Sequence, residues 1–150
     1  MFAWFKTLFA YGVAADPAGL SATARAGAAG ERVASDFLQR KCGFSIVTRN
    51  WHSPRDKRDE LDLVCRDGEV LVFVEVKTRA SHALVPGYYE VNSRKKKALR
   101  RACSTYLRAL GSRLPQTYRF DIVEISTRVA GGPPEIRHFE NVPLFPKDFV

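Results

Sequence analysis

Three residues have the types and the spacing that cleavage of a phosphodiester requires. Asp62 lies in an alternating segment, residues 60–65, and Glu75 and Lys77 lie two residues apart in an apolar run, residues 69–79. Carboxylate oxygens are ligands for Mg²⁺ or Mn²⁺, and such an ion polarises a phosphate and helps to generate hydroxide. A lysine beside the ion can orient the water or offset negative charge that develops. The pattern predicts a metal-dependent phosphodiester hydrolase with Asp62, Glu75 and Lys77 as catalytic residues.

An ordinary ion pair is the competing interpretation of Glu75 and Lys77. Successive strand side chains point to opposite faces, so Glu75 and Lys77 share one face with Phe73 and the valines of the run share the other. Taken alone, the pattern favours an exposed pair at the end of a strand, because such pairs are common. Two ionisable groups on one face of a core strand nevertheless need a partner or a metal if they are buried.

A tight turn decides whether Asp62 lies beside Glu75. The Asp67-Gly68 pair is typical of a two-residue hairpin loop. With these two residues as the loop, Asp62 lies opposite Phe73 and diagonal to Glu75, on the same face of the sheet. A three-residue loop would reverse the parity and separate the two carboxylates. The metal site therefore depends on this turn.

Helices and further strands are expected around the hairpin. Residues 16–27 are rich in Pro, Gly and Ala and are typical of a linker, although their alanines could extend the following helix. We therefore expect an extension over residues 1–26 and one domain over residues 27–150. Apolar residues at helical spacing predict helices over residues 28–41 and 93–110, the second with Ser93 as its N-cap. Composition and alternation predict three more strands, over residues 44–51, 117–127 and 136–142.

The charge of the chain limits its partners. The net charge is +8 and the sequence pI is about 9.7, which favours nucleic acid first and an acidic membrane surface second. Nine basic residues and no acidic one lie between Asn92 and Phe120, more than a solvated helix face requires. Because Lys and Arg contacts to phosphates dominate nonspecific affinity, we expect DNA as the partner. The candidate nucleic-acid contacts are Lys95, Lys96, Lys97, Arg100 and Arg101.

Cysteine usage and the first residues indicate a cytoplasmic protein. The three cysteines are widely spaced without a CxxC pair, which argues against a disulfide framework and a zinc knuckle. Residues 1–15 are aromatic but shorter than the roughly 20 apolar residues of a membrane span, so we expect no transmembrane segment. A signal peptide is less favoured because Lys6 interrupts the apolar run. An extension that packs on the domain or on a partner is the preferred interpretation.

Several short motifs together resemble one protein family. They are Gly30-Glu31-x-x-Ala34, Arg49-Asn50-Trp51, Glu60-Leu61-Asp62-Leu63-Val64, the Phe73 to Arg79 run, Lys95-Lys96-Lys97 and Arg119-Phe120-Asp121. From about Gly27 to Val142 the chain resembles the YraN-like proteins of bacteria. That family is placed in the PD-(D/E)XK, restriction-endonuclease-like superfamily and is similar to Holliday-junction resolvases.

The resemblance implies an α/β fold with a restriction-endonuclease-like mixed β-sheet flanked by helices. It implies Asp62, Glu75 and Lys77 as the motif residues and adds Glu31 to Asp62 and Glu75 as a metal ligand, although the helix dipole alone would explain an acid at that position. Lys95 becomes a further site or phosphate contact. Mg²⁺ or Mn²⁺ is the expected cofactor, and branched or structured DNA and a homodimer are expected by analogy with the resolvases.

Two other functions stay open. The chain departs from the usual family pattern at Asp59, where members carry glycine, and at Leu84-Val85, where they carry Phe-Gly, which bears on activity and substrate more than on fold. A non-catalytic nucleic-acid-binding module would keep the fold and the basic helix. A membrane-associated scaffold would use residues 1–15 together with the basic surface.

Overall fold

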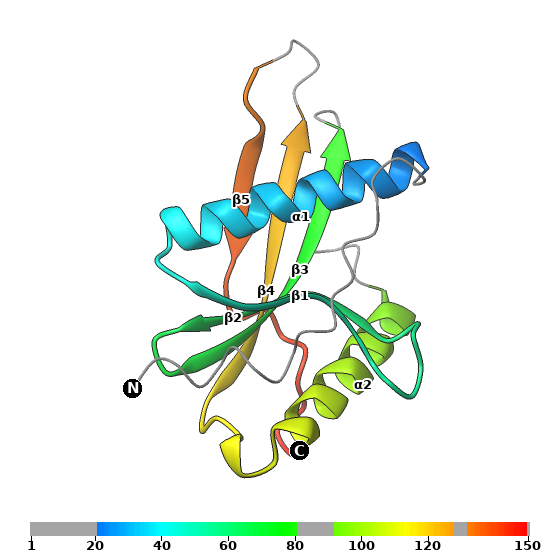
Figure 1. Ribbon diagram of the computed structural model, residues 1–150, viewed down its shortest axis with the longest axis vertical. Helices are drawn as coiled ribbons and strands as arrows, with labels where there is room; N and C mark the ends of the chain where they lie inside the picture. Colours follow the sequence, from blue (N-terminus) through cyan, green and yellow to red (C-terminus); the bar gives the residue numbers. More distant parts are fainter. Residues whose placement is uncertain (1–20, 81–91, 128–131, 150) are drawn as a thin grey trace.

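The structure is a computed structural model that describes residues 21–80, 92–127 and 132–149. Five strands form one sheet in the order β1-β2-β3-β4-β5, in which β3 and β4 are parallel and the other neighbours are antiparallel (Figure 1). The expected mixed-sheet α/β fold of restriction-endonuclease-like architecture is thereby confirmed. The elements in chain order are α1 (Ala22–Arg40), β1 (Ser45–His52), β2 (Glu60–Asp67), β3 (Val70–Ala80), α2 (Ser93–Leu110), the 3-10 helix η3 (Gly111–Arg113), β4 (Tyr118–Thr127) and β5 (Glu135–Phe139).

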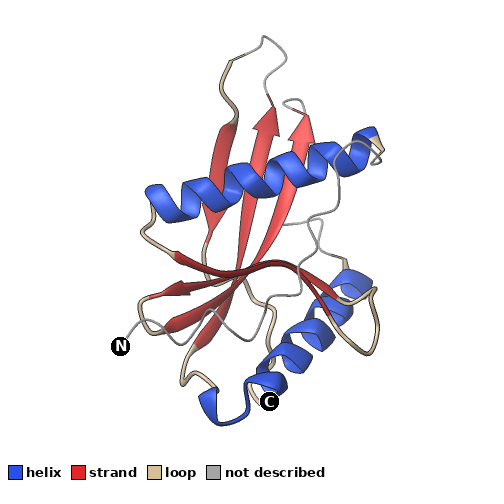
Figure 2. Ribbon diagram, viewed as in Figure 1, coloured by secondary structure: helices blue, strands red, loops and turns tan. Residues whose placement is uncertain are grey.

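Each face of the sheet is buried by one helix. Val74 packs with Leu38 of α1, whereas Phe73 packs with Leu99 and Tyr106 of α2. Because neighbouring strand residues point to opposite faces, the alternation along β3 divides the core into two clusters. Figure 2 shows α1 crossing the strands of the sheet. Full burial of a large apolar side chain contributes roughly 1.5–3 kcal/mol, so the central strands are firmly held.

The helices begin at caps that the composition alone did not indicate. Ser21 caps α1 by accepting a hydrogen bond from the backbone N–H of Ala24 at 3.2 Å, so residues 22–27 are helical and not a linker, which is the alternative that their alanines left open. The high helix propensity of alanine outweighs the glycine there. The α2 helix has the predicted bounds, but its N-cap is Asn92 and not Ser93. The Asn92 Oδ1 atom accepts from the backbone N–H of Lys95 at 2.9 Å.

The β2–β3 hairpin has a different loop from the predicted one. Asp67 pairs with Val70, so the loop is Gly68-Glu69. The φ angle of Gly68 is +56°, and a type II′ turn needs a positive φ only at its first loop residue, where glycine fits best. The register moves by two residues, which preserves the parity. Asp62 and Glu75 therefore share a face as predicted.

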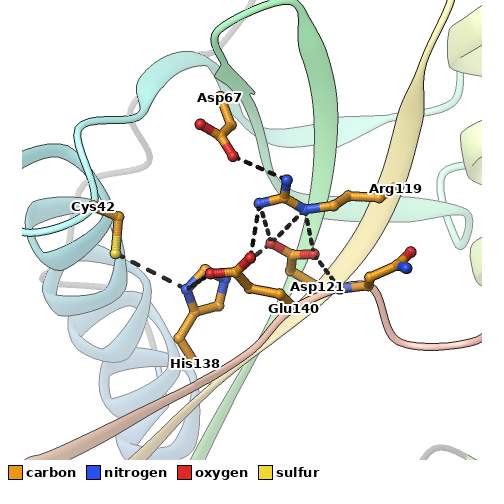
Figure 3. A network of polar contacts seen from close by, with 7 residues as sticks. Cys42, Asp67, Arg119, Asp121, His138 and Glu140 are labelled. Carbon is orange, nitrogen blue, oxygen red and sulfur yellow. Dashed lines mark hydrogen bonds and ion pairs between the residues drawn. The ribbon is translucent and has the colours of Figure 1, made fainter.

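The end of the hairpin joins a buried ion-pair network, shown in Figure 3. Asp121 is fully buried and accepts hydrogen bonds from Arg119 Nε at 3.0 Å and from the Asn141 backbone N–H at 2.9 Å. Its Oδ2 atom lies 2.9 Å from His138 Nε2, and Arg119 also donates to Asp67 at 2.9 Å. Burial alone would raise the pKa of Asp121, but these hydrogen bonds hold it below its usual value. The network ties β4 to β5 and to the hairpin.

A cysteine approaches the same network without reactive character. Cys42 Sγ lies 3.9 Å from His138 Nδ1. Burial, and then the charges of Glu140, Asp67 and Asp121, raise the pKa of Cys42, so the thiol stays protonated at neutral pH. All three cysteines are free, as expected for a chain without a disulfide framework.

The predicted extension at the start of the chain falls mostly outside the described residues. Residues 1–20 and the Leu84-Val85 pair lie outside the described residues. Within the part of the chain that is described, no helix is both long and apolar enough to cross a membrane.

Trp51 packs edge-on against Tyr106 with ring centroids 5.3 Å apart, which makes it a core residue.

Candidate active site

Asp62, Glu75 and Lys77 meet on the face of the sheet that α2 covers. The pairing of β2 with β3 ends at Leu63 and Val74, and Asp62 and Glu75 are the next residues on the two strands. Asp62 Oδ2 accepts a hydrogen bond from the backbone N–H of Val76 at 2.7 Å, which fixes the carboxylate against β3. The charge of Glu75 acts on Asp62, so the two carboxylates lie close to each other where the paired part of the hairpin ends.

Two lysines share one oxygen of Glu75. Lys77 Nζ lies 2.8 Å from Glu75 Oε1, and Lys95 Nζ, from the first turns of α2, lies 3.3 Å from the same atom. Glu75 is 3 % exposed, whereas the side chains of Lys77 and Lys95 are 28 % and 32 % exposed. The ion pair of Glu75 and Lys77 is therefore not the exposed pair of the alternative interpretation. It joins a buried carboxylate to ammonium groups that reach solvent.

The second carboxylate oxygen of Glu75, Oε2, has different surroundings from Oε1. Among the described residues, Glu75 Oε2 is buried and has no hydrogen-bond partner. A buried charged oxygen without a partner is costly, and such an atom needs a cation, a water or a ligand group. The unpartnered oxygen therefore fits a metal-binding role for Glu75.

The electrostatics of Asp62 agree with a cation site. Burial, followed by the charge of Glu75, raises the pKa of Asp62 to about 7. The hydrogen bond from the Val76 N–H and the charge of Lys95 act in the opposite direction, while Glu31 adds to the rise. The burial of Asp62 and the negative charge of Glu75 disfavour ionisation of Asp62 at neutral pH. A divalent cation between them would remove that conflict.

Glu31 approaches the site from α1. Burial, and then the charges of Glu60 and Glu75, raise the pKa of Glu31, while a side-chain hydrogen bond with Asn50 lowers it. The preceding residue explains how the helix comes so near, because a Cβ atom on Gly30 would collide with Oγ1 of Thr78 in β3. Glycine is thus required where α1 crosses the sheet.

The carboxylates form a pair with a third acid at longer range. Within residues 21–80, 92–127 and 132–149, no group of three His, Cys, Asp or Glu side chains stands close enough to hold a metal. The structure therefore brings Asp62 and Glu75 together, with Glu31 within electrostatic reach. Mg²⁺ is commonly held by one or two carboxylates together with waters and substrate phosphates, so this donor set fits the ion.

The five predicted nucleic-acid contacts have different surroundings. Lys95 lies in the site, Lys96 is half-buried, and Lys97 is exposed. Arg100 Nε donates to the Leu144 carbonyl at 2.6 Å, so it fastens the C-terminal segment. Arg101 is exposed and forms a two-point ion pair with a buried acid, Asp59.

Sequence reasoning missed two charged residues on the same face. Glu124 of β4 pairs with Lys77 in the parallel register and is 4 % exposed. Arg79 Nε, two residues beyond Lys77, lies 3.7 Å from Glu124 Oε2. The spacing of Arg79 could have revealed its face, because side chains two residues apart point the same way. The position of Glu124 depends on a parallel pairing that no local pattern specifies.

Comparison with known proteins identifies the family. The profile of the uncharacterised protein family UPF0102 matches residues 30–125. A UPF0102 protein of Symbiobacterium thermophilum is 44% identical over 101 residues, which are 67% of this chain and 81% of that protein. One from Beutenbergia cavernae is 40% identical over 116 residues, 77% of this chain and 93% of its own length. One from Geobacter metallireducens is 37% identical over 115 residues, 77% of this chain and 88% of its own length. The chain therefore belongs to the UPF0102 family, the YraN-like group that its motifs resemble.

Proposed function

We propose that this protein is a nuclease that cleaves phosphodiester bonds in DNA with the help of Mg²⁺ or Mn²⁺. The observation that carries the proposal is the arrangement around Glu75. One of its oxygens faces two lysines, the other is buried without a partner among the described residues, and Asp62 lies within its electrostatic reach. A buried acid pair flanked by ammonium groups that reach solvent suits a charged phosphate substrate.

Asp62 and Glu75 would hold the cation. The bound ion would supply Lewis-acid polarisation of the phosphate and a water of lowered pKa. Glu31, held by Asn50 at the edge of the site, adds negative charge that favours a divalent ion over a monovalent one. The covered, partly desolvated position strengthens these charge interactions.

The lysines act on the substrate side of the acids. The Lys77 ammonium, 2.8 Å from Glu75 and 28 % exposed, is placed to orient the attacking water and to offset charge on the phosphate. Lys95 lies 3.3 Å from the same oxygen and is 32 % exposed, so it can contact a phosphate oxygen as well. Positioned charges of this kind typically change rates by about 10²–10³ when one is removed.

Cleavage assays with matched variants test the proposal. Purified protein is incubated with Mg²⁺ or Mn²⁺ and with duplex, single-stranded and four-way-junction DNA, and with RNA. We expect cleavage of at least one form by the wild type and its loss in Glu75→Gln and Lys77→Met, both with unchanged circular dichroism. Glu69→Gln, in the exposed hairpin loop, serves as the control and should cleave normally. Absence of cleavage of every form by the wild type would refute the nuclease.

A non-catalytic nucleic-acid-binding module is the second candidate. It is favoured by one observation, that Lys77 and Lys95 already neutralise Glu75 Oε1 without a metal. The module predicts steeply salt-dependent binding of DNA, no cleavage, and no thermal stabilisation by Mg²⁺. The nuclease predicts stabilisation by Mg²⁺ that Asp62→Ala abolishes. A homodimer and a cytoplasmic location belong to both candidates, and sedimentation of the pure protein tests the dimer.

A further inference from the structure

The connection between β1 and β2 is fastened to the outside of α2. Figure 1 shows this segment, residues 53–59, reaching the helix, and we name it the arm. Asp59, at the end of the arm, is 5 % exposed, and its two oxygens accept from Arg101 Nη2 at 2.6 Å and from Arg101 Nε at 3.1 Å. Two parallel charge-assisted hydrogen bonds fix both distance and orientation. The arm is therefore positioned by the helix.

The arm is also closed on itself by hydrogen bonds. The Ser53 backbone N–H donates to the Asp59 carbonyl at 2.9 Å, and the Asp59 N–H donates to the Asp56 carbonyl at 3.0 Å. The Asp56 side chain accepts from the backbone N–H and the guanidinium of Arg58 at 3.0 Å. These contacts give the arm a defined shape that Asp59 attaches to Arg101.

Arg101 belongs to a basic stripe on α2. Arg94, Lys97, Arg101 and Arg108 are all exposed and are spaced three, four and seven residues apart, which places them on one side of a helix. The buried residues of α2 occupy the opposite side. At 1.5 Å per residue, the stripe is about 21 Å long.

The arm adds three exposed basic residues next to this stripe: Arg55, Lys57 and Arg58. The side chain of Arg58 is 89 % exposed, although it pairs with Asp56 at 2.9 Å. Arg58, through its hydrogen bonds, and Arg101, through its charge, both lower the pKa of Asp56, which places Arg101 close to the tip of the arm. The next residue along the chain is Glu60, the first of β2, so the arm leads directly to the candidate active site.

We infer that the arm and the α2 stripe form one continuous surface that binds the phosphate backbone of a nucleic-acid duplex, with Asp59 holding the arm in place. The inference rests on the proposed function, because it assigns the substrate surface beside that site. It also gives a role to the acid at position 59, which otherwise only lowers the positive charge of this surface.

The arm and the stripe carry no exposed large hydrophobic side chain, which favours a duplex. Proteins that hold single strands stack bases on exposed aromatic side chains, and membrane-binding surfaces insert apolar ones. Among the described residues, Leu114 is the only exposed large hydrophobic side chain, and it lies in neither the arm nor the stripe. A duplex presents phosphates and needs no stacking, so it matches the surface best.

The first test removes the charges of the arm. The variant Arg55→Gln/Lys57→Gln/Arg58→Gln is compared with Arg40→Gln/Lys41→Gln/Arg137→Gln, which removes the same charge from exposed positions elsewhere. Binding of a labelled DNA duplex is followed by fluorescence anisotropy at several salt concentrations. We expect the arm variant to bind about tenfold more weakly, with a salt slope reduced by about 1 per lost contact, and the control to bind within about twofold of the wild type. Equal binding by the two variants would overturn the inference.

The second test separates the role of Asp59 in holding the arm from its effect on the net charge. Asp59→Asn and the exposed control Asp36→Asn each raise the net charge by one, so charge alone predicts equal or tighter binding for both. Loss of the anchor predicts weaker binding for Asp59→Asn only. Arg101→Lys keeps its charge but loses the two-point geometry, and it replaces Asp59→Asn if that variant does not fold. Tighter binding by Asp59→Asn, or wild-type binding by Arg101→Lys, would overturn the role of Asp59.

The outcomes distinguish this inference from the proposed function. If the wild type binds no nucleic acid, both fall. If the wild type binds and cleaves while the arm variant behaves like its control, only the inference falls. If the arm variant loses binding to phosphatidylserine vesicles but keeps its affinity for the duplex, the surface serves a membrane and the inference is wrong.

Discussion

Lys95 and Glu75 join the basic helix to the acidic pair: the Lys95 ammonium of α2 lies 3.3 Å from Oε1 of Glu75 on β3. The Asn92 cap fixes the start of this helix by accepting from the Lys95 N–H, so the same residue is held at its backbone and at its side chain. The nearby Glu75 and Asp62 charges raise the pKa of Lys95 against the opposing effect of burial. Lys95 is therefore charged and in direct competition with any cation at Glu75.

Removing Lys95 should separate metal binding from cleavage. In Lys95→Met, one of the two ammonium groups leaves Glu75 Oε1, so we expect Mg²⁺ to bind more tightly, by a few fold. Cleavage should nevertheless slow by about 10²-fold or more, because a charge that contacts the phosphate is lost. Metal-dependent thermal shifts and single-turnover cleavage measure the two effects. Lys41→Met, at an exposed position outside the site, the arm and the stripe, should change neither, and parallel loss of both in Lys95→Met would show that the lysine only supports the fold.

The pKa of Asp62 predicts how stability depends on pH without metal. Its folded-state pKa is raised from 3.8 to about 7, by burial first and then by Glu75. A group with a raised folded-state pKa contributes stability that is fully present below its unfolded-state pKa, here about pH 4. This contribution of Asp62 is lost as the pH rises through 7. We expect the unfolding temperature in a chelator to fall over that range and Mg²⁺ to restore it at pH 8. Asp62→Asn should flatten the profile, and an unchanged profile in that variant would contradict the assignment.

Local patterns predicted the elements well because they depend on neighbouring residues. The apolar spacing of Leu99, Ala102 and Tyr106 predicted the α2 helix, and all three residues are buried as that spacing requires. Alternation along β3 likewise predicted that Glu75 lies on the same face of the strand as Phe73 and Lys77. The loop was misplaced by one residue because the Asp-Gly signal fits glycine at either loop position, and only the paired strands decide between them.

The contacts of the site depended on pairing between distant segments. The parallel register of β3 with β4 places Glu124 beside Lys77, and it follows from a crossover through α2 that no short pattern encodes. The ion pair of Arg101 with Asp59 joins residues 42 positions apart. The count of basic residues in the sequence could therefore only suggest that Arg101 contacts nucleic acid. The sequence thus indicated the chemistry through residue types, while the partners of each charge required the fold.

We expect a side chain at position 30 to destabilise the protein and a side chain at position 27, in the same helix, to stabilise it. A Cβ atom at Gly30 meets Oγ1 of Thr78, but one at Gly27 meets nothing within 4 Å. We expect Gly30→Ala to destabilise the protein by about 1–3 kcal/mol through overpacking, and Gly27→Ala to stabilise it by about 0.5–1 kcal/mol. Urea unfolding measures both. Thr78→Ala combined with Gly30→Ala should restore much of the loss, and failure of that rescue would show that the clash is not the cause.

The buried carboxylate of Asp121 should make the fold sensitive to acid. Burial would raise its pKa, but hydrogen bonds from His138, from Arg119 and from the Asn141 N–H lower it below 3.8. A lowered pKa gives stability that is present above about pH 4 and is lost as the pH falls through the folded-state value. At pH 7 we expect Asp121→Asn to cost about 3–5 kcal/mol, because Arg119 and His138 lose a buried partner.

The size of this loss should itself depend on pH. As acid protonates Asp121 in the wild type, the difference in unfolding free energy from Asp121→Asn should shrink below pH 4, measured by urea titration at each pH. The control Asp36→Asn, at an exposed position on α1, should stay within about 0.5 kcal/mol of the wild type throughout. His138→Gln keeps a hydrogen-bond donor toward Asp121, so it should fold and show a smaller loss, and it replaces Asp121→Asn if that variant does not fold. A constant difference at every pH would mean that packing, and not the carboxylate charge, stabilises this junction of β4 and β5.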